Sequence, residues 1–168
     1  ADDIIHSVSI SADGEYIVAG SYDNKVYLFD KDSSTPLWSY SAGGDVESVS
    51  ISADGEYLVA GSKDSKVHFF GKSSSTPLWS YTSNEDIMAV DISADGEYIV
   101  AGDQFGYVLF FHKSSSTPLW KKGIGGEIRD VSISSDGNYI AVGNAYYGNS
   151  KLVLFNKDSD DPLWSYSA

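Results

Sequence analysis

Short apolar segments separated by polar turns recur along the whole chain. Polar and apolar residues alternate over residues 7–11, and an Asp-Gly pair follows them. Residues 16–20 and 25–29 are rich in β-branched and aromatic side chains, and residues 37–40 add a fourth short segment after a polar loop. Runs of this length, bounded by Asp, Gly, Ser and Pro, predict four β-strands, and no segment has the period of an amphipathic helix.

The same pattern occurs four times. The Asp-Gly turn returns at intervals of 41 residues, with its first position at Ala12, Ala53, Ala94 and Ser135. A Pro-Leu-Trp marker recurs with it and places the tryptophans at Trp38, Trp79, Trp120 and Trp164. A period near 40 residues is typical of units that bury their faces only by stacking on one another. We therefore divide the chain into units 1–41, 42–85, 86–126 and 127–168, and expect the four tryptophans to lie in equivalent environments.

The apolar character of the middle strands indicates how the units pack. The second and third strands of each unit are apolar on both faces, which favours sheets covered on both sides by other sheets. Four-stranded sheets stacked face to face around an axis form a β-propeller. The sequence thus predicts an all-β fold, a single propeller domain of four four-stranded antiparallel blades. Each unit holds its strands in chain order, so the seam between the first and fourth blades is expected to depend on side-chain packing alone.

The repeats resemble two known families. Residues 49–62 resemble the core of a WD40 repeat, and residues 66–70 with 77–81 resemble the end of a quinoprotein (PQQ-like) propeller repeat. This resemblance covers the whole chain and implies the propeller fold. Phe70-Gly71 stands where WD40 blades have Trp-Asp, and their Gly-His pair is missing, so their internal polar network is not expected. The chain has no cysteine and matches only the structural part of the quinoprotein repeat, so no quinone or other cofactor is expected.

The composition of the chain limits the classes of partner and site that can be expected. The chain has 24 acidic and 11 basic residues and a net charge of −13, so its field repels phosphate backbones and anionic lipids. Because of this repulsion, nucleic acid binding is not expected. Membrane insertion is not expected either, because no apolar run approaches the roughly 20 residues of a spanning helix. The absence of cysteine excludes thiol catalysis, zinc-thiolate sites and iron–sulfur clusters. The first residue, Ala1, fits a removed secretion signal as well as a trimmed chain, and we expect an extracellular or cell-surface location.

The histidines do not predict a catalytic or metal site. The chain has His6, His68 and His112, which occupy three different positions within their units. Repeat geometry therefore does not bring them together, and neither a metal site nor a Ser-His-Asp arrangement is expected. We expect them to be ordinary exposed or half-exposed side chains.

The acidic residues offer two further candidates. One carboxylate recurs in each Asp-Gly turn, at Asp13, Asp54, Asp95 and Asp136. Such carboxylates on one rim could act as the acid and base of a glycosidase, but the Asp-Gly context favours a turn role. Residues 158–161 (Asp-Ser-Asp-Asp) are the best calcium candidate, although they lack the length and glycine of a calcium loop. Glycine-rich residues 123–126 do not precede a helix and are not expected to hold phosphate.

The fourth unit departs most from the others. Val100-Ala101 becomes Ala141-Val142, which exchanges large and small side chains between the two faces of the sheet. It also has Tyr146-Tyr147 in a longer turn. Terminal repeats differ in this way when their outer face meets something other than a standard neighbour.

These observations predict a non-enzymatic structural propeller that self-associates through blade edges and faces into an oligomer, fibre or surface layer. The fourth strands present unpaired edges with aromatic side chains and few charges. Head-to-tail contacts would build a filament, and two chains could also complete a ring of eight blades. The candidate contact residues are Trp38, Tyr40, Tyr81, Tyr146, Tyr147 and Tyr166. The alternatives are a ligand- or protein-binding scaffold and a monomer kept soluble by its charge.

Overall fold

All regular elements of the protein are β-strands. The computed structural model describes residues 1–145 and 150–168. The first two blades comprise β1 (Ile5–Ile10), β2 (Tyr16–Ser21), β3 (Lys25–Asp30), β4 (Trp38–Ser41), β5 (Val46–Ile51), β6 (Tyr57–Ser62), β7 (Lys66–Gly71) and β8 (Trp79–Thr82). The last two comprise β9 (Ile87–Ile92), β10 (Tyr98–Asp103), β11 (Tyr107–His112), β12 (Trp120–Gly123), β13 (Glu127–Ile133), β14 (Tyr139–Ala145), β15 (Lys151–Asn156) and β16 (Trp164–Ser167). No helix that could cross a membrane occurs in these residues.

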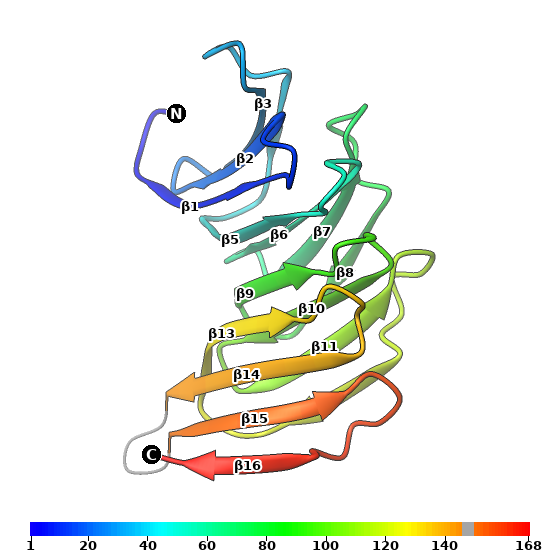
Figure 1. The fold of residues 1–168 in the computed structure, drawn as a ribbon. Helices are drawn as coiled ribbons and strands as arrows, with labels where there is room; N and C mark the ends of the chain where they lie inside the picture. Colours follow the sequence, from blue (N-terminus) through cyan, green and yellow to red (C-terminus); the bar gives the residue numbers. More distant parts are fainter. Residues whose placement is uncertain (146–149) are drawn as a thin grey trace.

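Each blade is an antiparallel sheet whose four strands follow one another in chain order, as predicted. The first strands of the blades, β1, β5, β9 and β13, contact one another in succession, and the fourth strands form the outer edges. Figure 1 shows the blades one after another, from β1 near the N-terminus to β16 at the C-terminus. The fold is therefore a β-propeller of four four-stranded blades.

The expected seam between the first and fourth blades is not formed. The buried apolar residues of the described chain gather in three clusters, one at each junction between consecutive blades, and no cluster joins β1–β4 to β13–β16. Figure 1 accordingly places the first and last blades at opposite ends of the molecule. Side-chain packing along the chain builds three interfaces, and the ring stays open.

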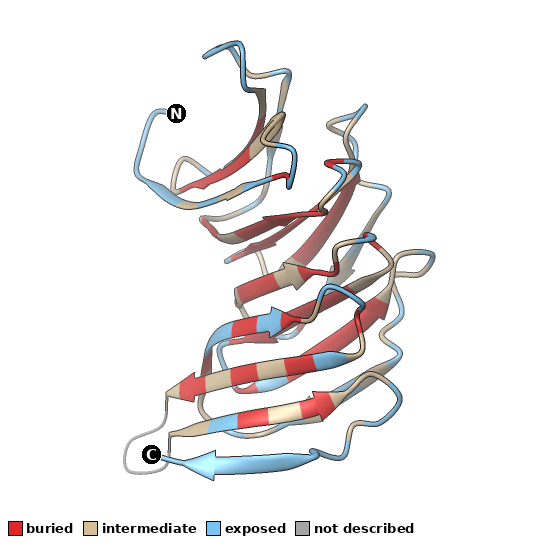
Figure 2. Cartoon of the chain, viewed as in Figure 1, coloured by how far each residue is buried: buried red, intermediate tan, exposed pale blue. Residues whose placement is uncertain are grey.

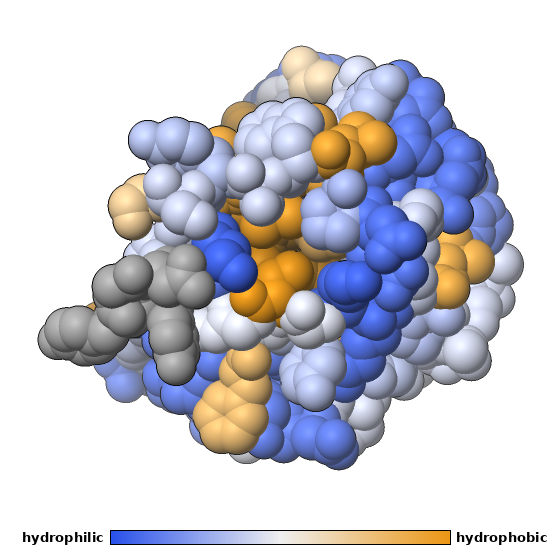
Figure 3. Space-filling model, turned by 90° about the horizontal axis from the view of Figure 1, so that it is seen from below, coloured by the Kyte–Doolittle hydropathy of each residue, from blue (hydrophilic) through white to orange (hydrophobic). Residues whose placement is uncertain are grey.

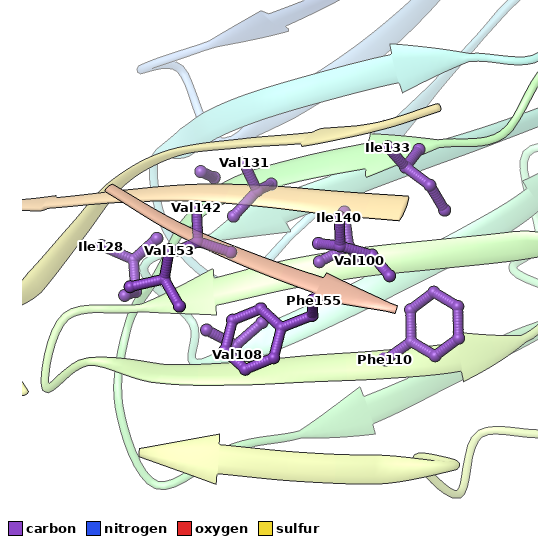
Figure 4. Close-up of a cluster of buried hydrophobic side chains, with 11 residues drawn as sticks. Val100, Val108, Phe110, Ile128, Val131, Ile133, Ile140, Val142, Val153 and Phe155 are labelled. Carbon is purple, nitrogen blue, oxygen red and sulfur yellow. The ribbon is translucent and has the colours of Figure 1, made fainter. Parts of the chain in front are cut away.

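Each junction is a layer of buried apolar side chains between two sheets. Between the third and fourth blades, Phe110 and Val108 of β11 meet Phe155 and Val153 of β15 and Ile128 of β13 (Figure 4). All five side chains are at most 2% exposed. Burial is greatest along the middle blades, and β16 is exposed throughout (Figure 2). Apolar residues on both faces of the middle strands thus have the covering sheets that the sequence predicted.

Candidate functional site: the open faces of the end blades

His68 is the one histidine that the sequence interpretation placed wrongly. Its side chain is only 1% exposed. Its Nε2 lies 3.0 Å from Asp64 Oδ2 and its Nδ1 lies 2.9 Å from Ser80 Oγ. The expectations of an exposed or half-exposed side chain and of no Ser-His-Asp arrangement are therefore both wrong for this residue. Since each histidine occurs in only one unit, comparing the units could not reveal the contact; the pairing of β7 with β8, which sets His68 opposite Ser80, creates it.

The geometry of this group fits a structural tie better than a nucleophile. Asp64 also accepts hydrogen bonds from the backbone N–H groups of Gly43 and Lys66. Burial works to raise the pKa of Asp64, but these hydrogen bonds and the one to His68 outweigh it and lower the pKa. The His68 ring packs against Tyr40 of the first blade, with ring centroids 5.1 Å apart. The group therefore fastens the β6–β7 turn to the outer strand β8 and to the preceding blade.

The first blade makes the hydrogen bond to its turn aspartate with a different side chain. Tyr27 occupies the position equivalent to His68, and its Oη donates to Asp23 Oδ2 over 2.5 Å. Burial and this hydrogen bond raise the pKa of Tyr27 to about 12. A phenol thus takes the place of the imidazole in the hydrogen bond to the turn aspartate, as a structural role permits.

The third and fourth blades place the turn acceptor two residues earlier. Phe105 stands at the position of Asp64, but Asp103 is fully buried and accepts the N–H groups of Phe105 and Tyr107 over 3.1 and 2.8 Å. In the fourth blade, Asn144 accepts the N–H of Lys151 over 2.6 Å. Sequence analysis missed both residues because it compared only the turn position itself. An Asp or Asn at the end of the preceding strand was the available signal.

The remaining ionisable candidates have local partners. His6 Nδ1 lies 2.9 Å from Glu47 O, and His112 Nε2 lies 3.1 Å from Glu97 Oε2. Each Asp-Gly aspartate accepts the hydroxyl of the serine two residues before it over 2.6 Å, in the turns of Asp13, Asp54, Asp95 and Asp136. For Asp13, the hydrogen bonds from Ser11 and from the N–H of Glu15 lower the pKa. These carboxylates are turn residues, as their context indicated.

The acidic side chains of the calcium candidate at residues 158–161 form ion pairs with lysines. Lys157 Nζ lies 2.7 Å from Asp158 Oδ1, and Lys122 Nζ lies 3.6 and 3.4 Å from Asp160 and Asp161. Within residues 1–145 and 150–168, no group of three or more acidic or histidine side chains could hold a metal ion. A pocket of about 220 Å³ lies beside Lys122, between β12 and the last two strands.

The clearest departure from a packed core is on the first blade. Ile5, Val8 and Ile10 of β1 are 45%, 65% and 59% exposed. The equivalent residues of the second blade, Val46, Val49 and Ile51, are at most 7% exposed because the first blade covers them. The first blade therefore presents an apolar surface that no other sheet of the described residues covers, and we call it the leading face.

The fourth blade presents a second surface of this kind at the other end. Tyr139, Leu152, Trp164 and Tyr166 are 49%, 43%, 48% and 65% exposed, and we call their side of the blade the trailing face. Alternate residues of β14 and β15 point the other way into the core. Seen from below, orange apolar residues lie in the middle of the molecule among pale and blue residues; tyrosine and tryptophan are pale on this hydropathy scale (Figure 3). β16, which carries two of the exposed aromatics, lies lowest in Figure 1.

The structure separates the residues that the sequence offered as contacts. Trp38 and Tyr40 pack against Phe70 of the second blade, and Tyr81 packs against Phe111 of the third. These three rings are engaged within the chain, whereas Tyr166 is exposed. Tyr146 and Tyr147 lie outside the described residues. The expectation of equivalent tryptophans holds for the first three blades and is wrong for the last, where Trp164 is 48% exposed and no sheet of the described chain packs against it.

Comparison with known proteins agrees with this architecture. No curated protein matches the chain at significant similarity. A family model described as outer membrane protein assembly factor BamB, built on PQQ-type repeats, matches residues 4–127, which is more than half of the chain. The match runs from the start of the first blade to the first strand of the fourth. The chain is thus a repeat-built β-propeller scaffold, and it belongs to the BamB-like family of PQQ-repeat proteins.

Proposed function

We propose that this protein is a non-enzymatic structural module that self-associates through the leading and trailing faces of its end blades. At both ends of the stack, apolar side chains whose equivalents in the middle blades are buried against a neighbouring sheet are exposed, and this difference carries the proposal. Contiguous apolar patches on soluble proteins mark sites of interaction. Removing such surface from water stabilises a complex by roughly 25 cal/mol per Å².

The chemistry of the rest of the molecule supports a role without catalysis. The buried ionisable groups fasten turns to strands, as Asp64 with His68 and Asp23 with Tyr27 do. The family is described as an assembly factor, a task of binding other proteins. That description also supports the second candidate, a scaffold on which a different protein covers the open faces.

The family description refers to an outer membrane, and we extend the proposal to an extracellular or cell-surface location for this chain. Fractionation of the source cells tests this. Recovery in the surface or secreted fraction is the expected result, and recovery with the cytoplasmic fraction would contradict it.

Sedimentation of the purified chain tests the association. A single chain has a mass of 18.1 kDa, and larger species should form as the protein concentration rises. Their fraction should increase with salt, because each copy carries a charge of −13 and salt screens the repulsion between copies. Monomer alone at high concentration and high salt would remove the proposal.

Two matched variants locate the association. Leu152→Glu places a charge on the trailing face and should abolish the larger species. Leu119→Glu is the control, because Leu119 is also exposed (56%) but lies beside an outer strand of the third blade. If the control abolishes association and Leu152→Glu does not, blade edges carry the contact and the two faces do not.

A further inference from the structure

The three junctions within the chain repeat one set of contacts. At each, a tryptophan of the earlier blade donates its indole N–H to a lysine carbonyl of the later blade. Trp38 Nε1 lies 2.7 Å from Lys72 O, Trp79 Nε1 lies 2.8 Å from Lys113 O, and Trp120 Nε1 lies 2.9 Å from Lys157 O. This direct hydrogen bond fixes the register of one blade on the next.

A tyrosine adds a second contact at each junction. The ring of Tyr16 lies so close to Gly55 of the next blade that a Cβ there would be 2.7 Å from Tyr16 Cδ2. Lys72 Nζ stands 4.5 Å from the centroid of the same ring. Tyr57 and Tyr98 meet their glycines and lysines in the same way. Only a residue without a side chain accommodates the ring.

The strands nearest the axis complete the set. The N–H of Ala12 donates to Ala53 O over 2.9 Å, and the turns of the following blades repeat this bond. Gly20 leaves room for Val46, whose Cγ1 would lie 2.6 Å from a Cβ at Gly20. Gly61 leaves the same room for Ile87.

The trailing face carries the first half of this set without its partners. Trp164, Tyr139 and Gly143 are equivalent to Trp38, Tyr16 and Gly20, and the structure describes no acceptor for Trp164 Nε1 and no ring or lysine against Tyr139. The nearest atom to a Cβ at Gly143 would be a carbonyl oxygen of its own blade, at 4.0 Å. The N–H of Ser135, equivalent to that of Ala12, likewise has no partner in the described chain.

The leading face carries the other half. Lys31 is equivalent to Lys72, Gly14 to Gly55, and Ile5 to Val46. Among the described residues, Lys31 O accepts no hydrogen bond, and no atom lies within 4 Å of a Cβ at Gly14. Ile5 is 45% exposed. The partners that Trp164, Tyr139 and Gly143 lack on the trailing face are therefore present on the leading face as Lys31, Gly14 and Ile5.

We propose that the trailing face of one copy docks on the leading face of a second copy, in the register of the internal junctions. This inference rests on the proposed function and names its partner and geometry. Trp164 Nε1 donates to Lys31 O of the second copy, the Tyr139 ring covers its Gly14 beneath its Lys31 Nζ, and Gly143 receives its Ile5. The contact is heterologous, so repetition gives a ring when the rotation closes and a filament when it does not.

Engineered cysteines test the register directly, because the chain has none of its own. At the first junction a Cβ at Gly20 would lie 3.3 Å from Val46 Cβ, close to the separation of about 3.5–4.5 Å in disulfides. The pair across the proposed contact is Gly143→Cys in one copy and Ile5→Cys in another. A single chain with Gly20→Cys and Val46→Cys is the control for geometry and should form its disulfide internally.

The two single variants are oxidised separately and then together. Disulfide-linked dimers should form mainly on mixing, since the contact joins unlike faces. Association without a mixed disulfide, or with efficient disulfides in either variant alone, would overturn the register while leaving the proposed function standing. A chain that remains monomeric overturns both and means that a different partner covers the faces.

A conservative variant isolates the indole hydrogen bond. Trp164→Phe keeps a ring on the trailing face but removes the donor, and should weaken association about three- to ten-fold. Trp120→Phe is its control, because its hydrogen bond lies within the chain, and should leave the association constant unchanged. Equal association of Trp164→Phe and the wild type contradicts the register. In sedimentation, a limiting species of two chains is a closed ring and a continuing series of larger species is an open filament; either retains the proposed contact.

Discussion

The middle of the molecule and its two ends use the same residues with different results. Phe70 and Leu58, between the first and second blades, have no exposed surface, whereas their equivalents Phe29 and Ile17 on the first blade are half-buried. The side chains are alike, and the neighbouring sheet makes the difference. In repeat-built proteins, stability is approximately a sum of contributions from units and from the interfaces between them. A blade therefore gains most of its apolar stabilisation from its neighbour.

This comparison also explains why the end blades carry the functional proposal. In the middle of the chain, the face of a blade is already covered by the neighbouring blade and is not accessible to another molecule. The same face at an end keeps its apolar side chains, its tryptophan donor and its vacant glycine. The proposed association needs no special residue, only a blade face that no other sheet of the described chain covers.

The largest expected difference is between two tryptophans. Trp79→Ala removes a ring packed on Phe69 and Phe111 and should lower the free energy of unfolding by about 3–5 kcal/mol. Trp164→Ala removes a half-exposed ring and should cost less than about 1 kcal/mol. Urea unfolding followed by far-ultraviolet circular dichroism, at a dilution where the chain is monomeric, measures both. Equal losses would mean that the ends are as well packed as the middle.

Two glycines give the next largest contrast. A Cβ at Gly61 would lie 2.5 Å from Ile87 Cγ2 and 3.0 Å from Val90 Cγ1, so Gly61→Ala should destabilise the fold by about 2–3 kcal/mol. A Cβ at Gly143 would meet no described atom closer than 4.0 Å, so Gly143→Ala should leave the monomer unchanged or stabilise it by about 0.5 kcal/mol. Thermal unfolding of the two variants side by side checks this. A comparable loss at Gly143 would show that its surroundings are already filled.

The sequence was sufficient for the strands and the blades because their signals are local. In the first blade, the Asp-Gly turn and the apolar runs around it predicted strand ends to within two residues, as β2 at Tyr16–Ser21 illustrates. The open ring could not be predicted in this way. A repeat pattern predicts which surfaces of each unit are covered by the next unit. It does not predict the angle between successive blades, which decides whether the last blade meets the first.

The internal hydrogen bonds of the turns were not predicted, for a different reason. His68, Tyr27 and Asp103 each occur in a single unit, so comparison between units treated them as exceptions. Their partners are fixed by strand pairing and by turn geometry, which place Ser80 opposite His68. Side-chain identity at one position was not informative until the neighbouring strand was known.

The hydrogen bonds of Asp64 in the second blade should make the free energy of unfolding depend on pH in the acid range. Because hydrogen bonds lower the pKa of Asp64 below its ordinary value of 3.8, the fold favours the ionised carboxylate. That stabilisation is present above the unfolded-state pKa and is lost as the pH falls through the lower folded-state value. Asp64→Asn should therefore cost about 1–2 kcal/mol near neutral pH, and the cost should shrink below pH 3.8. Denaturant unfolding across this range measures it.

The exposed acid Asp32 provides the control for this prediction. Its side chain is 77% exposed and pairs with its neighbour Lys31. Asp32→Asn should leave stability nearly unchanged at every pH. A cost for Asp64→Asn that stays constant into acid would show that the carboxylate's charge does not contribute.

The smallest effect is expected at the first blade's tie, and it has the opposite pH dependence. Burial and the hydrogen bond to Asp23 raise the pKa of Tyr27 from 10.0 to about 12, so the fold favours the neutral phenol. This stabilisation is complete below pH 10 and is lost as the pH rises through about 12. Tyr27→Phe should cost about 0.5–1 kcal/mol at neutral pH. The wild type's advantage should disappear in alkali, as denaturant unfolding along a pH series would show.

Tyr139→Phe is the matched control, because its ring lies on the open trailing face at 49% exposure and the structure describes no hydrogen bond from its hydroxyl. It should match the wild type in stability, whereas Tyr27→Phe should also remove the tyrosine that ionises last in an ultraviolet titration. If all tyrosines of the wild type ionise together near pH 10, the Tyr27 to Asp23 hydrogen bond is not maintained in solution. The first blade would then differ from the second in two ways: its leading face is exposed, and its turn lacks the hydrogen bond between the strand residue and the turn aspartate.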